Sequence, residues 1–133
     1  MTVGLANCLK IAESVRSHER TARSVVDDAL ATAERLQGKW KTFIRITPEL
    51  ARRQAEQVDR LIGRGRQLPL AGVPFAVKDL IDVAGLPTTC GSRVFLERVA
   101  ERSASVVGRL TGAVAGLIGK LNMHECAFGF TGE

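Results

Sequence analysis

The segment that most constrains the fold is a short apolar run that ends in charged residues. Val73 to Val77 are apolar or small, and Lys78 and Asp79 follow directly. An apolar run of this length, bounded by turn residues, predicts a strand buried on both faces. A lysine that ends such a strand is partly desolvated, which favours its neutral amine as a proton acceptor. The alternative is that Lys78 pairs with Asp79 or Asp82 and has no chemical role.

Length and composition narrow the broad class of protein. The 133 residues are one domain's worth of chain, with 45% hydrophobic and 25% charged residues, which is ordinary for a globular protein. The sequence has no apolar segment long enough to span a membrane, and its first residues lack the basic and apolar regions of a secretory signal. We therefore expect no membrane association and a cytoplasmic location.

The net charge of +5 raises the question of a nucleic-acid partner. Basic residues are interspersed with acidic ones, however, and the only local excess comprises Arg60, Arg64 and Arg66. Aromatic residues are sparse and tyrosine is absent, so no surface for stacking bases is visible. We expect solvated helix faces rather than a nucleic-acid partner.

The three cysteines, Cys8, Cys90 and Cys126, have a spacing that fits neither a disulfide framework nor a zinc site. We expect reduced thiols with mostly structural roles. A Cys90 nucleophile near Lys78 is conceivable, but a small packed residue is the favoured interpretation. His124 and Cys126 are too few to close a metal site without distant ligands. No metal and no other cofactor is therefore expected.

The periodicity of apolar residues predicts three helices before the buried strand. The first covers residues 5–16, the second follows a capping box at Ser24 and stops at Gly38, and the third begins at Thr47 and Pro48. Residues 39–47 are rich in strand-forming side chains. We divide the chain into an N-terminal helix, residues 1–20, and the beginning of a larger domain, residues 21–133.

After the buried strand, the pattern predicts a helix capped by Ser103 and a second buried strand over residues 113–119. Strand, helix and strand in this order indicate an α/β fold in which a right-handed crossover joins two parallel strands. Ligands of such sheets bind beyond the carboxyl ends of the strands. Lys78 and the segment 122–125 both leave the sheet at that edge, so we expect them to be neighbours.

Two motifs at a matching separation resemble the amidase signature family, and the resemblance covers about residue 21 to the end of the chain. The first motif comprises residues 70–79, 82–89 and 91–92, and the second comprises residues 119–120, 122–125 and 127–129. The resemblance implies an α/β/α fold with a mixed sheet, of which this chain supplies the N-terminal helices and first strands. It also implies hydrolysis or transfer of the amide group of a small molecule by a Ser–cis-Ser–Lys triad.

In the mechanism that the resemblance implies, Lys78 is the general base and acts through the middle serine on the nucleophilic serine. The resemblance also places four residues near the substrate, namely Asn122, Met123, Gly129 and Thr131. For Met123, a gap-filling role in the core is the alternative.

The sequence departs from the family pattern in two ways. Both catalytic serines of the family lie in a Gly/Ser-rich stretch beyond Gly132, and no such stretch occurs before Glu133. We therefore expect a truncated fragment that does not hydrolyse amides alone. In addition, Val114 occupies a position that the family usually fills with glycine, and Gly116 falls inside the second strand. We expect that strand to be poorly formed.

A truncated sheet would expose an edge and apolar faces. A second copy of the chain, giving a homo-oligomer, or a complementing chain would cover them. The alternative function is accordingly a non-catalytic pseudoenzyme or interaction module that associates through its exposed sheet.

Overall fold

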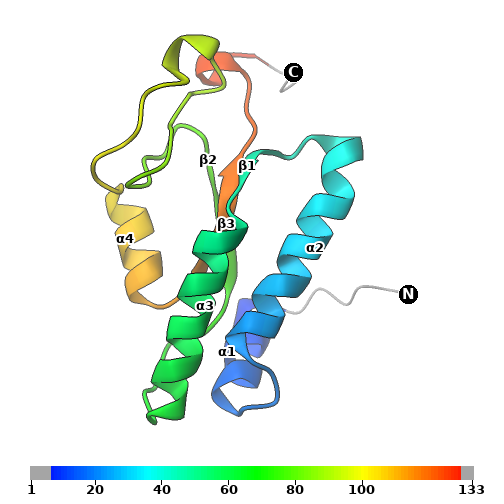
Figure 1. The fold of residues 1–133 in the computed structure, drawn as a ribbon, viewed down its shortest axis with the longest axis vertical. Helices are drawn as coiled ribbons and strands as arrows, with labels where there is room; N and C mark the ends of the chain where they lie inside the picture. Colours follow the sequence, from blue (N-terminus) through cyan, green and yellow to red (C-terminus); the bar gives the residue numbers. More distant parts are fainter. Residues whose placement is uncertain (1–6, 130–133) are drawn as a thin grey trace.

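The computed structural model of the chain describes residues 7–129, which form helices packed on a small sheet (Figure 1). The helices of this range are α1 (Cys8–Arg16), α2 (Ala22–Trp40), α3 (Pro48–Gly63) and α4 (Ser105–Gly112). The strands are β1 (Phe43–Ile46), β2 (Pro74–Lys78) and β3 (Gly116–Leu121). Two short 3₁₀ turns, Arg93–Phe95 and Glu125–Ala127, lie in the connections. The α/β class predicted from the sequence is confirmed.

The sheet has the strand order β1-β3-β2, with β3 in the centre. Strands β2 and β3 are parallel and are joined through α4, as the sequence pattern predicts. Their carboxyl ends meet, because Lys78 pairs with Leu121. Strand β1 adds to the other side of β3 in the antiparallel direction, so the sheet is mixed. The expected proximity of Lys78 to the segment after β3 is therefore confirmed.

Strand β2 is less buried than the sequence predicts. Only Val77 is buried, whereas Pro74, Phe75 and Ala76 are half-buried and Lys78 is exposed. The reason is topological: β2 forms an edge of the sheet within the described residues, so no strand covers its outer side. The prediction of a strand buried on both faces is wrong for this part of the chain.

Strand β3 is well formed and begins later than predicted, at Gly116 rather than at residue 113. The three residues before it close α4 in a Schellman motif, in which Val114 N donates to Thr111 O (3.0 Å) and Ala115 N to Leu110 O (3.1 Å). This motif requires a left-handed residue, and Val114 adopts a φ of +64°. Valine thus takes the conformation for which glycine is usually selected, and the expected disorder of the strand does not occur.

Glycine within β3 allows an unusually close approach of β1. A Cβ atom on Gly119 would lie 2.4 Å from the carbonyl oxygen of Arg45. The pairing of β1 with β3 is irregular at this point, between Phe43 and Arg45. Gly119 therefore permits the bulge that brings β1 onto the central strand.

The helix boundaries differ from the sequence prediction where distant residues provide the cap. Helix α2 begins at Ala22, and its first two amides, those of Ala22 and Arg23, donate to the carboxylate of Asp59 in α3 at 2.7 and 3.1 Å. The Thr21 hydroxyl, rather than Ser24, caps the helix. A carboxylate at this position also complements the helix dipole. The same helix continues through Gly38 to Trp40 and ends at Lys41, which is left-handed.

Helices α3 and α4 also lack the side-chain caps that the sequence predicts. Pro48 begins α3 as expected, but the Thr47 hydroxyl donates to Leu117 O in β3 at 3.3 Å. Helix α4 begins at Ser105, and the Ser103 hydroxyl instead accepts a hydrogen bond from Ala84 N at 2.9 Å. Both hydroxyls thus connect their helices to neighbouring segments.

Two apolar clusters hold the helices to the sheet. Helices α2 and α3 pack on each other and on β3 (Figure 1). Their inward side chains form the larger cluster, which includes Val25, Val26, Leu30, Val58 and Ile62. The smaller cluster joins α4 to β2 and β3 through Val77, Val107 and Leu117. Together these clusters fix the two parallel strands whose ends carry the candidate site.

Candidate functional site

Lys78 lies at the carboxyl edge of the sheet, as the last residue of β2. The backbone beyond it is fixed, because Asp79 N donates to Leu121 O of β3 at 3.1 Å. Its side chain is exposed, which corrects the expectation of a desolvated amine. The alternative of a pair with Asp79 or Asp82 does not hold either, because those carboxylates face Lys120 and Arg98.

The buried lysine of this edge is Lys120, which the sequence analysis did not single out. Its side chain is completely buried, and its ammonium lies 3.0 Å from Oδ1 of Asp79, which is only 1% exposed. The ammonium also donates to the Thr88 hydroxyl at 3.0 Å and to Pro87 O at 3.2 Å. Three acceptors match the three hydrogens of an ammonium group. A buried charge is tolerated only when it is paired and hydrogen-bonded in this way.

The carboxylate of Asp79 is equally well satisfied. Its Oδ2 accepts hydrogen bonds from Thr89 N at 3.0 Å and from the Thr89 hydroxyl. The Asp79 carbonyl accepts from Cys90 N at 3.0 Å. One residue next to Lys78 therefore binds β3 through Lys120 and the loop 87–92 through Thr89.

We call this group the buried polar cluster and define it as Asp79, Thr88, Thr89, Ser92 and Lys120. All five residues are at most 6% exposed. Only one further polar residue, Thr47, is buried to a similar degree in the part of the chain that the structure describes. Buried polar side chains are thus concentrated behind Lys78, where they fix the backbone from which its side chain projects.

The loop 87–92 is in turn held against the segment that follows β3. Gly91 has a φ of +70°, and a Cβ atom there would lie 2.8 Å from Met123 O. Cys126 N donates to Cys90 O at 2.8 Å, and the Ser92 hydroxyl contacts Glu125 Oε1 at 2.5 Å. The two family-like motifs of the sequence are therefore in direct contact in the structure.

An ion pair lies at the rim of the cluster, between Arg98 and Asp82. The guanidinium binds the carboxylate through two hydrogen bonds, of 2.8 and 3.2 Å. Arg98 is the main cause that lowers the pKa of Asp82 to about 2, with smaller contributions from the Thr88 hydroxyl and the Lys120 charge. Asp82 therefore stays ionised throughout the neutral range and holds the 98–100 segment to the site.

The four predicted substrate-proximal residues have different surroundings. Met123 is buried beside Gly91, which favours its alternative role in packing. The Asn122 side chain is exposed but donates to Lys41 O at 3.1 Å and accepts from Met123 N at 2.9 Å. Gly129 is exposed, and a Cβ atom on it would overlap the His124 ring. Thr131 lies outside the described residues.

The alternation of side chains along a strand could have revealed which lysine is buried. Successive residues of a strand point to opposite faces. Val77 is buried, so Lys78 is directed away from it, whereas Asp79 returns to the buried side. Lys120 pairs with Val77 across the sheet. The sequence analysis used the apolar run alone and therefore assigned the buried charge to the wrong lysine.

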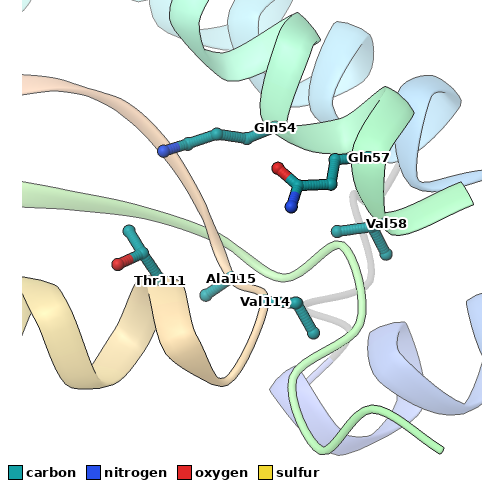
Figure 2. A pocket seen from close by; sticks show the side chains of 6 residues that line it. All are labelled: Gln54, Gln57, Val58, Thr111, Val114 and Ala115. Carbon is teal, nitrogen blue, oxygen red and sulfur yellow. The ribbon is translucent and has the colours of Figure 1, made fainter. Parts of the chain in front are cut away.

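Cavities elsewhere in the described residues offer no comparable chemistry. A cavity of about 90 Å³ lies between α3 and the junction of α4 with β3, where Gln57 extends toward the turn that carries Val114 and Ala115 (Figure 2). It has room for a few water molecules only. A larger groove of about 450 Å³ runs along α2 and is lined mainly by apolar side chains, among them Val25, Leu36, Phe43 and Ile118.

Residues 7–129 contain no group of three or more His, Cys, Asp or Glu side chains that could hold a metal ion. Across the same range, every helix is too short or too polar to cross a membrane.

Comparison with known proteins identifies what the chain is similar to. A family model described as Amidase matches residues 24–133. One relative, a component of the glutamyl-tRNA(Gln) amidotransferase of Cyanothece sp., is 36% identical over 97% of this chain, which corresponds to 27% of that protein. Another relative, AtzE, a component of the 1-carboxybiuret hydrolase of Pseudomonas sp., is 42% identical over 94% of this chain and 28% of its own length. The chain thus spans about a quarter of the length of these relatives.

Solved structures agree with this result. A structure of a vestigial protein complex, described as revealing the evolutionary origins of an s-triazine catabolic enzyme, matches 95% of this chain with a TM-score of 0.91 and 41% identity. The match covers 28% of that structure's chain. Native peptide amidase from Stenotrophomonas maltophilia matches 93% of this chain with a TM-score of 0.85 and 25% identity, and 26% of that enzyme is covered.

Proposed function

The chain belongs to the Amidase family, and from that premise we propose that it supplies the lysine-bearing N-terminal part of an enzyme that hydrolyses or transfers amide groups. The observation that carries the proposal is the position of Lys78 at the shared carboxyl edge of β2 and β3. Ligands of α/β sheets bind beyond this edge. Lys78 projects its side chain there from a backbone that the buried polar cluster fixes.

The proposed role of Lys78 is that of general base. A base must reach the proton that it removes, and the exposed amine of Lys78 is accessible. In the mechanism that the resemblance implies, the amine accepts the proton of the nucleophilic serine through a middle serine. Lys120 cannot take this part, because its ammonium is completely buried and all three of its hydrogens are directed at protein oxygens.

We propose that a polypeptide of residues 1–133 does not hydrolyse amides without further residues. Its sequence contains no Gly-Gly-Ser-Ser stretch of the kind that carries both catalytic serines in the family. Lys78 then has no nucleophile to activate, and no oxyanion hole is available to stabilise the tetrahedral intermediate. An oxyanion hole alone contributes about 3–4 kcal/mol to the lowering of the barrier.

The substrate of the proposed activity is a small molecule with an amide group. One relative is named a hydrolase and another an amidotransferase, so the proposal extends to both reactions. Both relatives are also named subunits, which supports the proposal that this chain works together with another polypeptide.

A chimeric enzyme tests the catalytic proposal. Residues 1–133 of this chain replace the corresponding quarter of AtzE of Pseudomonas sp., and the product is assayed as that relative is assayed. We expect amide hydrolysis that Lys78→Ala abolishes and that Lys10→Ala, a change at an exposed lysine of α1, leaves intact. An active Lys78→Ala chimera would refute the role of Lys78.

A second candidate function is a non-catalytic interaction module, and the groove along α2 favours it. Its apolar lining, about 450 Å³ in volume, is open to a partner chain or to a second copy. The chimera distinguishes the two candidates, because a pure interaction module yields a folded but inactive chimera. Sedimentation of the isolated chain measures whether it associates with itself.

A further inference from the structure

Two cysteines lie on opposite sides of the contact between the loop 87–92 and the segment after β3. Cys90 precedes Gly91 in the loop, and Cys126 lies in the short 3₁₀ turn Glu125–Ala127. Both thiols are free, with Cys90 half-buried and Cys126 exposed. They are separated by 36 positions in the sequence (126 − 90) and meet only because the fold brings the two motifs together.

The backbone fixes how far apart these cysteines are. Cys126 N donates to Cys90 O at 2.8 Å, so only four short links separate the two Cα atoms. With standard bond lengths and angles, their separation is at most about 6 Å. Disulfide-bonded cysteines have Cα atoms about 4.4–6.8 Å apart. The pair therefore lies within bridging range without movement of the backbone.

Two further contacts hold the segments in this arrangement. The Ser92 hydroxyl reaches Glu125 Oε1 at 2.5 Å, and Gly91 packs so closely on Met123 that a Cβ atom would lie 2.8 Å from its carbonyl oxygen. Cysteines that are held near each other by surrounding contacts react with each other faster than with an external thiol, because little chain entropy remains to be lost.

We propose that Cys90 and Cys126 form a reversible disulfide that responds to the redox state and locks the loop 87–92 onto the segment after β3. With glutathione disulfide as oxidant, one thiolate attacks a glutathione sulfur, forms a mixed disulfide and releases one glutathione. The second thiolate then attacks the protein sulfur and releases the second glutathione. Two protons leave the protein thiols, and two electrons reduce glutathione disulfide to two molecules of glutathione.

The link would act on the candidate site through the loop that it closes. Thr88 and Thr89, which bind Lys120 and Asp79, lie within three residues of Cys90. The disulfide therefore stiffens the part of the buried polar cluster that faces the segment after β3. This inference does not depend on the proposed amidase activity, since it concerns only thiol chemistry and the contact between two segments.

The experiment equilibrates the purified chain in buffers of oxidised and reduced glutathione and analyses it by intact mass and peptide mapping. We expect a loss of two hydrogens without a retained glutathione, and one linked pair of peptides that contains Cys90 and Cys126. The Cys8→Ser variant should behave identically, because Cys8 lies in α1. Cys90→Ser and Cys126→Ser should instead each accumulate a glutathione adduct on the remaining partner.

A measurement in denaturant separates placement by the fold from mere presence of two thiols. The equilibrium constant for the link, relative to glutathione, should be at least about ten-fold larger in the native chain than in concentrated urea. Equal constants would overturn the proposal, and so would a native chain that carries only glutathione adducts or links through Cys8. Circular dichroism of each serine variant verifies that a lost link does not result from a lost fold.

Discussion

Two groups of ion pairs in this molecule join the same kinds of side chain in opposite surroundings. On the surface between α2 and α3, Asp27 lies 2.8 Å from Arg23 and 2.9 Å from Arg52. Behind Lys78, Asp79 lies 3.0 Å from Lys120. The surface side chains are about 40% exposed, whereas those of the second pair are at most 1% exposed. The contact distances are nearly equal, and the burial differs completely.

Burial decides what each pair contributes. Water and salt screen the surface group, and such pairs stabilise proteins little. The two arginines, Arg52 first and then Arg23, lower the pKa of Asp27, but its exposure limits the consequence for stability. In the buried pair, each charge depends on the other because neither can turn to water. The comparison teaches that the pair behind Lys78 fixes geometry, whereas the surface group mainly keeps charges solvated.

The largest expected effect follows from removing one charge of the buried pair. Lys120→Met leaves the Asp79 carboxylate buried without its cation, and we expect a loss of about 3–5 kcal/mol in the free energy of unfolding at neutral pH. Equilibrium unfolding in urea, followed by circular dichroism, measures it. The matched control is Arg52→Met on the surface, for which we expect a far smaller change. Similar losses from both substitutions would contradict the comparison.

A second pair of variants compares glycines in the two regions. Gly91→Ala places a Cβ atom 2.8 Å from Met123 O at a φ of +70°, so we expect a loss of about 1–3 kcal/mol. Gly38→Ala lies in α2, where a Cβ atom meets nothing within 4 Å, and it should add about 0.5–1 kcal/mol through helix propensity. Thermal unfolding of both variants gives the two signs, and a neutral Gly91→Ala would show that the loop contact is loose.

A smaller effect is expected at Val114, at the opposite end of β3 from the buried pair. Its left-handed backbone disfavours any Cβ atom, so Val114→Gly should be more stable than Val114→Ala by about 1 kcal/mol. Both variants lose the valine side chain, and their difference therefore isolates the backbone conformation. Urea unfolding measures this difference, and an Ala variant as stable as the Gly variant would argue against the Schellman motif.

The smallest expected effect concerns the rim of the buried cluster and depends on pH. The pKa of Asp82 is about 2 in the folded chain, below its ordinary value of 3.8. Its contribution to stability is therefore present above pH 3.8 and is lost as the pH falls toward 2. The side chain is 35% exposed, so the contribution is modest. Wild-type protein should lose more stability across this range than Asp82→Asn, and parallel pH profiles would show that the Arg98 contact is unimportant.

The sequence was sufficient for the features that depend on neighbouring residues. The order of β2, α4 and β3 predicted a parallel pair, and the position of Lys78 beside the segment after β3 followed from that topology. The family was also predicted, because two dense motifs occur at a specific separation. These features rest on local patterns and on general rules of chain connection.

Features that depend on distant contacts could not be predicted in the same way. Asp59 of α3 moves the start of α2 to Ala22, and β3 draws the Thr47 hydroxyl away from its helix. The burial of Lys120 depends on Thr88 and Pro87, more than thirty positions away. An apolar run indicates that a strand is buried, but the partners of a buried charge come from the whole fold.

The account assigns different tasks to two lysines at one edge of the sheet: the exposed Lys78 performs chemistry, and the buried Lys120 holds the backbone. The most direct test measures amide hydrolysis in the chimera and stability in the isolated chain for Lys78→Ala. We predict a fall in kcat/KM of at least about a hundred-fold with unchanged stability to urea, because a general base contributes that much or more. Retained hydrolysis, or destabilisation as large as that of Lys120→Met, would contradict the account.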